Sequence, residues 1–262
     1  MTTSTQSRQL FGDSKFKGLI TLNWVVFTDS LGWGIAFSVF AALFFNKQLN
    51  ILPASYSDSA RYILYEFLLS IYSFLMFFFA PFLGGIADRF GRKPGLKVSM
   101  AGLTIGFILC ALGCYYSMFW FLVVGRIISG MTAGSVSIAQ AATVDLSTPQ
   151  NKSFYLSVLM LCNTLGFSLG PILGSLFTPI HIAPVGTVTF LAGAAMSLIA
   201  LLGVIVFFKE TYTPKQKDKT HILRDFLNIK VALGMRGLNV YLLGMLFAMT
   251  AFVAFFSGAV AI

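Results

Sequence analysis

The chain has 262 residues, of which 57% are hydrophobic and only 10% are charged, and its mean hydropathy is +0.83. Because an ordinary soluble domain carries about 25% charged residues, this composition excludes a soluble globular protein and indicates an integral membrane protein. The net charge of +9 does not indicate nucleic-acid binding, since the basic residues lie between apolar runs and form no patch interleaved with stacking aromatic side chains.

Apolar runs separated by short polar segments define the expected membrane topology. Residues 1–17 are polar and lack the apolar core and cleavage site of a signal peptide, so we expect a cytoplasmic tail. Six runs within residues 18–208 are long enough to cross a bilayer as helices. We predict transmembrane helices over residues 18–45, 61–84, 95–116, 119–144, 153–178 and 185–208.

A polar segment over residues 209–237 and a last apolar run over residues 238–262 follow these six helices. We expect the polar segment to be a cytoplasmic central loop. Its residues 221–234 place apolar side chains on one helical face and charged ones on the other, which predicts either an amphipathic helix on the inner membrane surface or a loosely ordered basic linker. The last run predicts a seventh transmembrane helix.

A charged turn of unusual order joins the second and third predicted helices. It reads Gly85-Ile-Ala-Asp88-Arg89-Phe-Gly91-Arg92-Lys93-Pro94, with two glycines, one acid and three bases at fixed spacing. Cytoplasmic loops of membrane proteins collect lysine and arginine, so we expect this turn on the cytoplasmic side. The same rule places the amino terminus in the cytoplasm, because the outer segments then receive only Lys47 and Arg61.

This turn resembles the signature loop of the major facilitator superfamily of secondary transporters, G-x-L-A-D-R-x-G-R-K/R, with Ile86 where the family usually has leucine. The resemblance implies that Asp88 caps or clamps helix ends at a cytoplasmic gate, where the family's turn contacts the carboxy-terminal half. It also implies that the substrate cavity lies between two six-helix halves, and that the first and fourth helices line it.

A glycine motif in the fifth predicted helix extends the resemblance. Gly166, Gly170, Pro171 and Gly174 resemble the G-x-x-x-G-P-x-x-G pattern of the antiporter branches, and the chain as a whole is most like the drug:proton antiporters. Glycines four residues apart leave a groove on one helix face that admits a neighbouring backbone, and the proline allows a bend. A plain packing face is the other interpretation. The stretches Gly125-Arg126-Ile-Ile-Ser-Gly130, Asp145 to Lys152 and Lys209-Glu210-Thr211 resemble further elements of the family's amino-terminal half.

Two short segments of the chain are similar to each other. Ala80-Pro-Phe-Leu-Gly-Gly85 lies near the inner end of the second helix, and Gly170-Pro-Ile-Leu-Gly-Ser175 lies near the outer end of the fifth. These helices run in opposite directions, as two three-helix units of inverted topology require, although six letters can also match by chance. The predicted fold is an all-α integral membrane protein, a six-helix major-facilitator half made of two inverted three-helix repeats plus a seventh, terminal transmembrane helix.

Two ionisable side chains fall at membrane depth. Asp29 lies about 18 Å along the first helix from Lys17, and Arg126 lies about 9 Å beyond Trp120 at the outer interface, at 1.5 Å per residue. A charge at this depth costs at least about 2.5–3.5 kcal/mol on insertion scales, so it normally faces a partner or a transport pathway. We predict that Asp29 and Arg126 couple protons or bind substrate. A static buried ion pair that locks the first and fourth helices is the alternative.

Side chains near Asp29 suggest a cavity wall. Trp33 and Phe37 share its face of the first helix, and Asn163 adds a polar group near the middle of the fifth. A carboxylate followed by aromatic rings suits a lipophilic cation, through charge and ring-face attraction. Aromatic residues at helical spacing also occupy lipid-facing or core positions, so both interpretations stay open.

The sequence contains no motif that indicates enzymatic catalysis or a bound cofactor. The three cysteines fall within spans and lack metal or disulfide spacing, the two histidines have no companion ligands, and no phosphate-cradling glycine loop occurs. We therefore predict no catalytic residues, no metal and no cofactor.

The functional prediction is a secondary active transporter of the bacterial inner (plasma) membrane that exports small amphipathic or drug-like molecules in exchange for protons, either as this chain or as a truncated form. The alternatives are proton-coupled uptake of a sugar, organic acid or metal chelate, and a non-transporting fragment that needs a second half. The expected partners are the lipid bilayer, a small-molecule substrate, protons, and either a missing carboxy-terminal half or a second chain, because the family ordinarily has twelve or fourteen helices. Nucleic acid is not expected.

Overall fold

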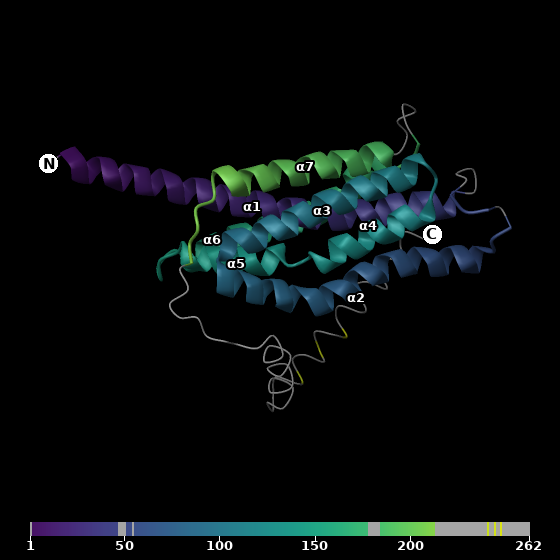
Figure 1. The fold of residues 1–262 in the computed structure, drawn as a ribbon, viewed down its shortest axis with the longest axis horizontal. Coiled ribbons are helices and arrows are strands. Elements are labelled where there is room, and N and C mark those ends of the chain that lie inside the picture. Colours follow the sequence, from purple (N-terminus) through teal and green to yellow (C-terminus); the bar gives the residue numbers. More distant parts are fainter. Residues whose placement is uncertain are drawn as a thin grey trace. The chain divides into compact units, whose positions relative to one another are not determined.

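The computed structural model describes residues 2–46, 51–53, 55–177 and 184–212, together with Val240, Gly244 and Phe247. The chain divides into two compact units, Met1–Lys215 and Gln216–Ile262. The first unit contains α1 Thr2–Phe45, α2 Asp58–Phe90, α3 Arg92–Tyr115, α4 Phe119–Met131, α5 Ser135–Asp145, α6 Lys152–Phe177 and α7 Thr187–Val206 (Figure 1).

These helices provide six spans that are long and apolar enough to cross a membrane, among the residues that the structure describes. The α4 and α5 helices share one of the six, Phe119–Asp145. Because lipid offers no hydrogen-bond partners, a spanning segment must satisfy its backbone groups internally, and a helix does this within one segment. The predicted all-α integral membrane fold is confirmed.

The carboxy-terminal predictions fall mostly outside the described residues. The predicted interfacial helix over residues 221–234 lies outside them entirely. Of the predicted seventh span over residues 238–262, only Val240, Gly244 and Phe247 are described, and all three are helical.

The fourth predicted helix, over residues 119–144, is present as one span, but the structure interrupts it. The structure has α4 and α5, with a break over residues 132–134. Ser99 Oγ of α3 donates to the Thr132 carbonyl oxygen at 2.7 Å, which removes that carbonyl from the helical ladder. The Thr132 hydroxyl donates back to the Ile128 carbonyl at 2.9 Å. Threonine and glycine are weak helix formers, which favours a helix end at this point.

The charged turn is shorter than predicted. The α2 helix continues through Phe90 and α3 begins at Arg92, so Gly91 alone joins them. Gly91 has φ of +107°, a region that side-chain-bearing L-residues rarely adopt, and its N–H closes α2 on the Ala87 carbonyl at 3.1 Å. The predicted helix ends at residues 84 and 95 are therefore wrong by several residues, because most charged side chains of the motif sit on helical turns. Similarly, α1 begins at Thr2, within the predicted tail.

The helix contacts follow an approximate twofold relation between two units of three spans each. If spans one, two and three correspond to spans four, five and six, then the contact of α1 with α6 corresponds to that of α4 with α2. The contact of α3 with α4 likewise corresponds to that of α7 with α1. All four contacts are present (Figure 1). The α3 and α7 helices correspond to each other under this relation, and they also pack together. Inverted repeats produce this arrangement.

The α1 and α6 helices approach most closely where glycines replace side chains. A Cβ atom added at Gly170 would lie 2.6 Å from the Gly34 Cα atom, so the two backbones are in direct contact there. Gly166 faces the backbone of α1 at Phe27, and Gly174 faces Ser38. The predicted groove on this helix is thus filled by α1, the helix that carries Asp29. Pro171 lies within the same helix without ending it.

Candidate functional site

Asp29 lies in the middle of the α1 span and is buried, with 6% of its surface exposed. The fully buried hydroxyl of Ser135, the first residue of α5, lies near this carboxylate but makes no hydrogen bond within the described part of the chain. Ser135 follows the break between α4 and α5 directly, so the break brings this hydroxyl to the carboxylate.

Arg126 lies in α4 and is buried, with 4% of its surface exposed. Its Nε donates to the Leu68 carbonyl of α2 at 3.2 Å. The guanidinium carbon lies 4.3 Å from the ring centroid of Tyr72 and 5.7 Å from that of Phe40. Its Nη2 is buried and has no hydrogen-bond partner. Two aromatic faces and one carbonyl therefore hold this cation, and part of its hydrogen-bonding capacity is unused.

Asp29 and Arg126 do not form the predicted alternative of a buried ion pair. Within the described residues, Arg92 forms ion pairs with Asp88 and Asp145, whereas no ion pair joins Asp29 to Arg126. The two side chains instead share a neighbour, because Tyr72 of α2 lies near both of them. The site thus comprises a buried acid and a buried cation with an aromatic ring near both.

Tyr72 is the site residue that sequence reasoning missed. Its side chain is 2% exposed, and Trp33 packs its ring edge-on against it with centroids 4.8 Å apart. The sequence contains 28 phenylalanines and 9 tyrosines, mostly at helical spacing, so no pattern distinguishes Tyr72 from lipid-facing rings. Only the packing of α2 on α4 reveals its contact with Arg126.

The structure places the predicted wall residues in the contacts between α1, α2 and α6. Phe37 is 3% exposed and packs against Phe167 of α6, with ring centroids 6.4 Å apart. Asn163 Nδ2 donates to Ser30 Oγ of α1 at 2.7 Å. Trp33 is half-buried against Tyr72. Phe37 therefore occupies a core position within this unit, whereas Trp33 and Asn163 keep partial exposure.

A second charged cluster surrounds Arg92, at the first turn of α3. Arg92 pairs with Asp88 one turn earlier in the motif, and its Nε donates to Asp145 Oδ2 of α5 at 3.2 Å. Its guanidinium also lies 5.1 Å from the ring centroid of Tyr212. One arginine therefore connects α2, α3, α5 and the segment after α7. The side chain of Asp88 is 64% exposed, so this cluster is accessible to water.

Glu210, in the segment after α7, adds a carboxylate to this cluster. Its Oε1 accepts the Arg92 backbone N–H at 2.8 Å, and its Oε2 accepts that of Lys93 at 3.0 Å. A carboxylate at a helix N-terminus satisfies free N–H groups and complements the helix dipole. Lys93 Nζ in turn donates to the Ile205 carbonyl near the end of α7, at 2.9 Å. Glu210 thereby ties the polypeptide after α7 to the start of α3. Arg89, by contrast, is exposed at the end of α2 and lies over the Phe90 ring.

The sequence model of the Major Facilitator Superfamily matches residues 22–262. The chain belongs to this superfamily. The superfamily consists of membrane transporters of small molecules, so the chain is a transporter-family protein and not an enzyme, as predicted.

Curated relatives of this superfamily member include tetracycline resistance proteins. The class C protein of Escherichia coli is 28% identical over 223 residues, which cover 85% of this chain and 52% of the relative. The class H protein of Pasteurella multocida is 29% identical over 195 residues, which cover 74% of this chain and 45% of the relative. The chain therefore spans about half the length of the curated relatives it matches. These matches confirm the predicted similarity to drug antiporters.

Solved structures show the same fold. The human organic anion transporter MFSD10 (TETRAN) superposes with a TM-score of 0.62 at 21% identity, over 77% of this chain and 49% of that one. A D-xylose-proton symporter superposes with a TM-score of 0.63 at 18% identity, over 87% of this chain and 57% of that one. The agreement over about half of each larger transporter matches the predicted six-helix half.

Proposed function

We propose that this chain forms the amino-terminal half of a proton-coupled exporter of small amphipathic, drug-like molecules. The transporter would reside in the bacterial inner membrane, with the amino terminus and the Arg92 cluster on the cytoplasmic side. The observation that carries the proposal is the buried carboxylate of Asp29, which lies at mid-membrane without an ion-pair partner among the described residues.

Proton exchange is the chemistry that suits Asp29. A carboxylate that is permanently ionised at this depth needs a counterion, whereas one that exchanges a proton can be neutral while buried and charged when water reaches it. Arg126 stays charged at all accessible pH values, so it can favour the ionised form of a nearby acid but cannot carry the proton itself. Tyr72 lies near both side chains, so its ring offers a route by which a change at one affects the other.

Export of drug-like molecules is supported by the names of the relatives, several of which are tetracycline resistance proteins. A second candidate substrate class is organic anions. The specific observation in its favour is the buried Arg126 Nη2, which has no hydrogen-bond partner and would pair with an anionic group that reaches the site. For either substrate class, we expect a small molecule that lies against aromatic side chains of α1 and α2.

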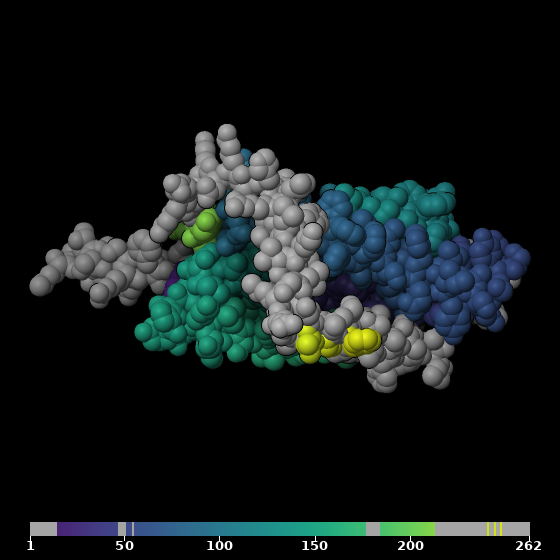
Figure 2. All heavy atoms as spheres, turned by 90° about the horizontal axis from the view of Figure 1, so that it is seen from below, coloured from purple at the N-terminus to yellow at the C-terminus, as the bar shows by residue number. Residues whose placement is uncertain are grey.

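A second half is expected to complete the cavity, either further along a longer chain or on a separate polypeptide. The α2 and α6 spans are the least buried of the six, with 22% and 17% of their most apolar windows buried. Figure 2 shows the side of the unit on which α2 (blue) and α6 (green) lie at the surface. Large apolar side chains are exposed on both helices, including Phe74, Phe77 and Phe78 of α2 and Leu165 and Leu169 of α6. A partner half packed on these two helices would cover them.

The test is substrate flux into inside-out vesicles that contain the full assembly, driven by an imposed proton gradient. We expect Asp29→Asn to abolish proton-driven accumulation while membrane insertion stays normal. Glu66→Gln is the matched control, because it removes a half-buried carboxylate from the end of α2 without touching the site. Accumulation at the wild-type level in the Asp29→Asn variant would reject the proposal. A panel of tetracycline, lipophilic cations, organic anions and sugars identifies the substrate, and the direction of flux separates export from uptake.

The isolated chain tests the need for a second half. We expect the purified 262-residue chain to insert into vesicles but to catalyse no coupled transport. Flux that appears only with a second half would support this expectation. Robust substrate-specific flux from a chain that forms no crosslinks would contradict it.

The orientation is tested by cysteine labelling. Phe90 is 61% exposed at the end of α2 beside the Arg92 cluster, so a membrane-impermeant reagent should label the Phe90→Cys variant only from the cytoplasmic side. The parent chain is the control, since Cys110 and Cys114 are buried. Labelling from the outside alone would invert the assigned topology.

A further inference from the structure

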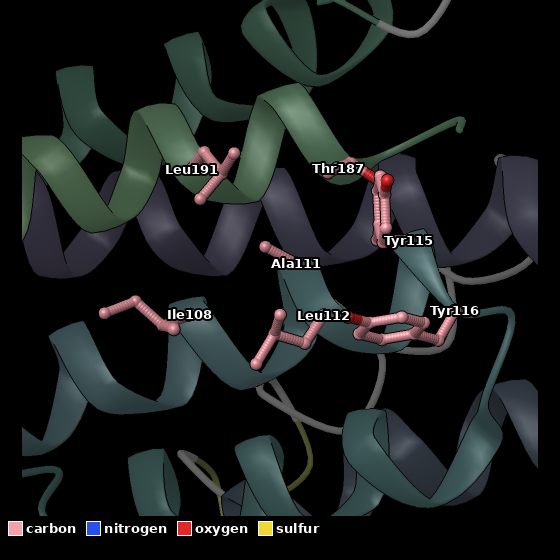
Figure 3. A pocket seen from close by; sticks show the side chains of 7 residues that line it. All are labelled: Ile108, Ala111, Leu112, Tyr115, Tyr116, Thr187 and Leu191. Atoms are coloured by element: carbon pink, nitrogen blue, oxygen red, sulfur yellow. The ribbon is translucent and has the colours of Figure 1, made fainter. Parts of the chain in front are cut away.

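A groove lies between α3 and α7 on the exterior of the unit, away from Asp29 and Arg126. It has a volume of about 260 Å³ and is lined by Ile108, Ala111, Leu112, Tyr115, Tyr116, Thr187 and Leu191 (Figure 3). Sites for drug-sized ligands usually enclose about 300–1,000 Å³, so this groove is smaller than a typical site for a whole amphipathic drug.

The lining of the groove changes from apolar to polar along the membrane normal. Ile108 and Leu191 lie toward its deep end, whereas Tyr115, Tyr116 and Thr187 lie at the membrane interface where α3 ends and α7 begins (Figure 3). Seven residues of helix separate Ile108 from Tyr115, a rise of about 10 Å at 1.5 Å per residue. Tyrosines are enriched at such interfaces because their rings are apolar and their hydroxyls reach polar groups.

A buried hydroxyl points to a ligand with a hydrogen-bonding group. Thr187 is 5% exposed, and its Oγ1 has no hydrogen-bond partner in the part of the chain that the structure describes. A buried hydroxyl that stays unpaired is costly, so a polar atom that enters the groove at this level would be stabilised. Methylene groups below that polar atom would lie against Leu112 and Leu191.

We propose that this groove binds one acyl chain of a membrane phospholipid, with an ester carbonyl of the lipid accepting a hydrogen bond from Thr187. The groove is polar at the membrane interface and apolar below it. A phospholipid has the same order, because its ester lies at the interface and its hydrocarbon chain lies below. The bilayer surrounds this face of α3 and α7, so the ligand is present at high local concentration. The assignment does not depend on the transported substrate or on proton coupling.

The test uses the full chain in vesicles of phosphatidylethanolamine and phosphatidylglycerol, with a trace of phosphatidylethanolamine that carries a diazirine in its acyl chain. After photolysis, adducts are mapped by mass spectrometry. We expect them to concentrate on the α3 segment 108–116 and on α7 near Leu191. Even labelling of all exposed residues of α3 and α7 would overturn the proposal, because it would indicate ordinary surrounding lipid only.

Two matched pairs of variants sharpen the test. Leu191→Trp fills the groove and should abolish the local adducts, whereas Leu198→Trp, two turns along the same helix face with similar exposure, should leave them unchanged. Thr187→Val should lower the local labelling about fivefold, the effect of losing one ordinary hydrogen bond. Thr189→Val is its control, because Thr189 is also buried and unpaired but does not line the groove.

Equal labelling in both members of either pair would contradict the proposal. Displacement of the probe by tetracycline would also contradict it, because the groove would then take transported molecules. Membrane insertion of each variant is verified by resistance to alkaline extraction, so a folding defect is recognised separately.

Discussion

The two charged regions of this protein satisfy their charges in opposite ways. Around Arg92, each charge meets an opposite charge or a helix end, and Asp88, Asp145 and Glu210 all contribute oxygens. Around Arg126, the cation contacts aromatic faces and a single carbonyl, and the buried acid Asp29 has no ion-pair partner among the described residues. The first region reaches water and the second lies at membrane depth.

We propose that this difference distinguishes charges that join helices from charges that exchange protons or bind substrate. Exposed ion pairs contribute little individually, so the Arg92 cluster acts through the number of elements it joins, namely α2, α3, α5 and the segment after α7. An unpaired charge inside the membrane is costly, and a sequence selected only for stability would replace it with an apolar residue. The unpaired state of Asp29 and Arg126 therefore favours a role in exchange over a role in holding helices together.

Replacing Arg126 should have the largest effect on transport. In Arg126→Ala, the aromatic faces of Tyr72 and Phe40 lose their cation, and a desolvated contact of this kind contributes about 2 kcal/mol, or roughly 30-fold in a rate or affinity. We expect at least this loss in proton-driven accumulation. Arg126→Lys should retain part of the activity, because the charge survives while the planar group that stacks on Tyr72 does not. Equal activity in wild type and Arg126→Ala would place Arg126 with the charges that join helices.

Loosening the contact of α1 with α6 should have the next largest effect. A Cβ at Gly170 would meet the Gly34 Cα atom at 2.6 Å, so Gly170→Ala should separate the helices at a cost of about 1–3 kcal/mol, typical of overpacking. Thermal unfolding in detergent measures the loss of stability. Gly84→Ala is the matched control, since a Cβ there meets nothing within 4 Å. If both variants unfold at the same temperature, the position of Asp29 does not depend on this contact.

Neutralising Asp88 should have the smallest effect on stability. Asp88 is largely exposed and pairs with Arg92, so we expect Asp88→Asn to cost less than about 1 kcal/mol of folding free energy. Transport should nevertheless fall more than in Lys97→Gln, because the charge of Lys97 is explained by membrane topology alone. The two variants are compared by thermal unfolding and by vesicle flux. A stability loss in Asp88→Asn comparable to that of Gly170→Ala would assign the cluster a mainly structural role.

The sequence by itself determined the features that depend on local composition and spacing. Apolar runs of sufficient length had to become membrane helices, because no other conformation satisfies isolated backbone segments in lipid. The glycines at 166, 170 and 174 predicted a face that admits another backbone, and the order of charges from Gly85 to Lys93 indicated the superfamily.

Tertiary structure alone decided which side chains meet. At the break over residues 132–134, Ser99 of another helix donates to the Thr132 carbonyl, and Ser135 directly after the break lies near Asp29. Tyr72 stands out from the other aromatic residues only because α2 packs on α4, which sets its ring against Arg126. Depth along a helix follows from counting residues, but the direction in which a side chain points depends on contacts distant in sequence. For that reason Asp29 and Arg126 could be predicted as buried charges, whereas their lack of an ion pair could not.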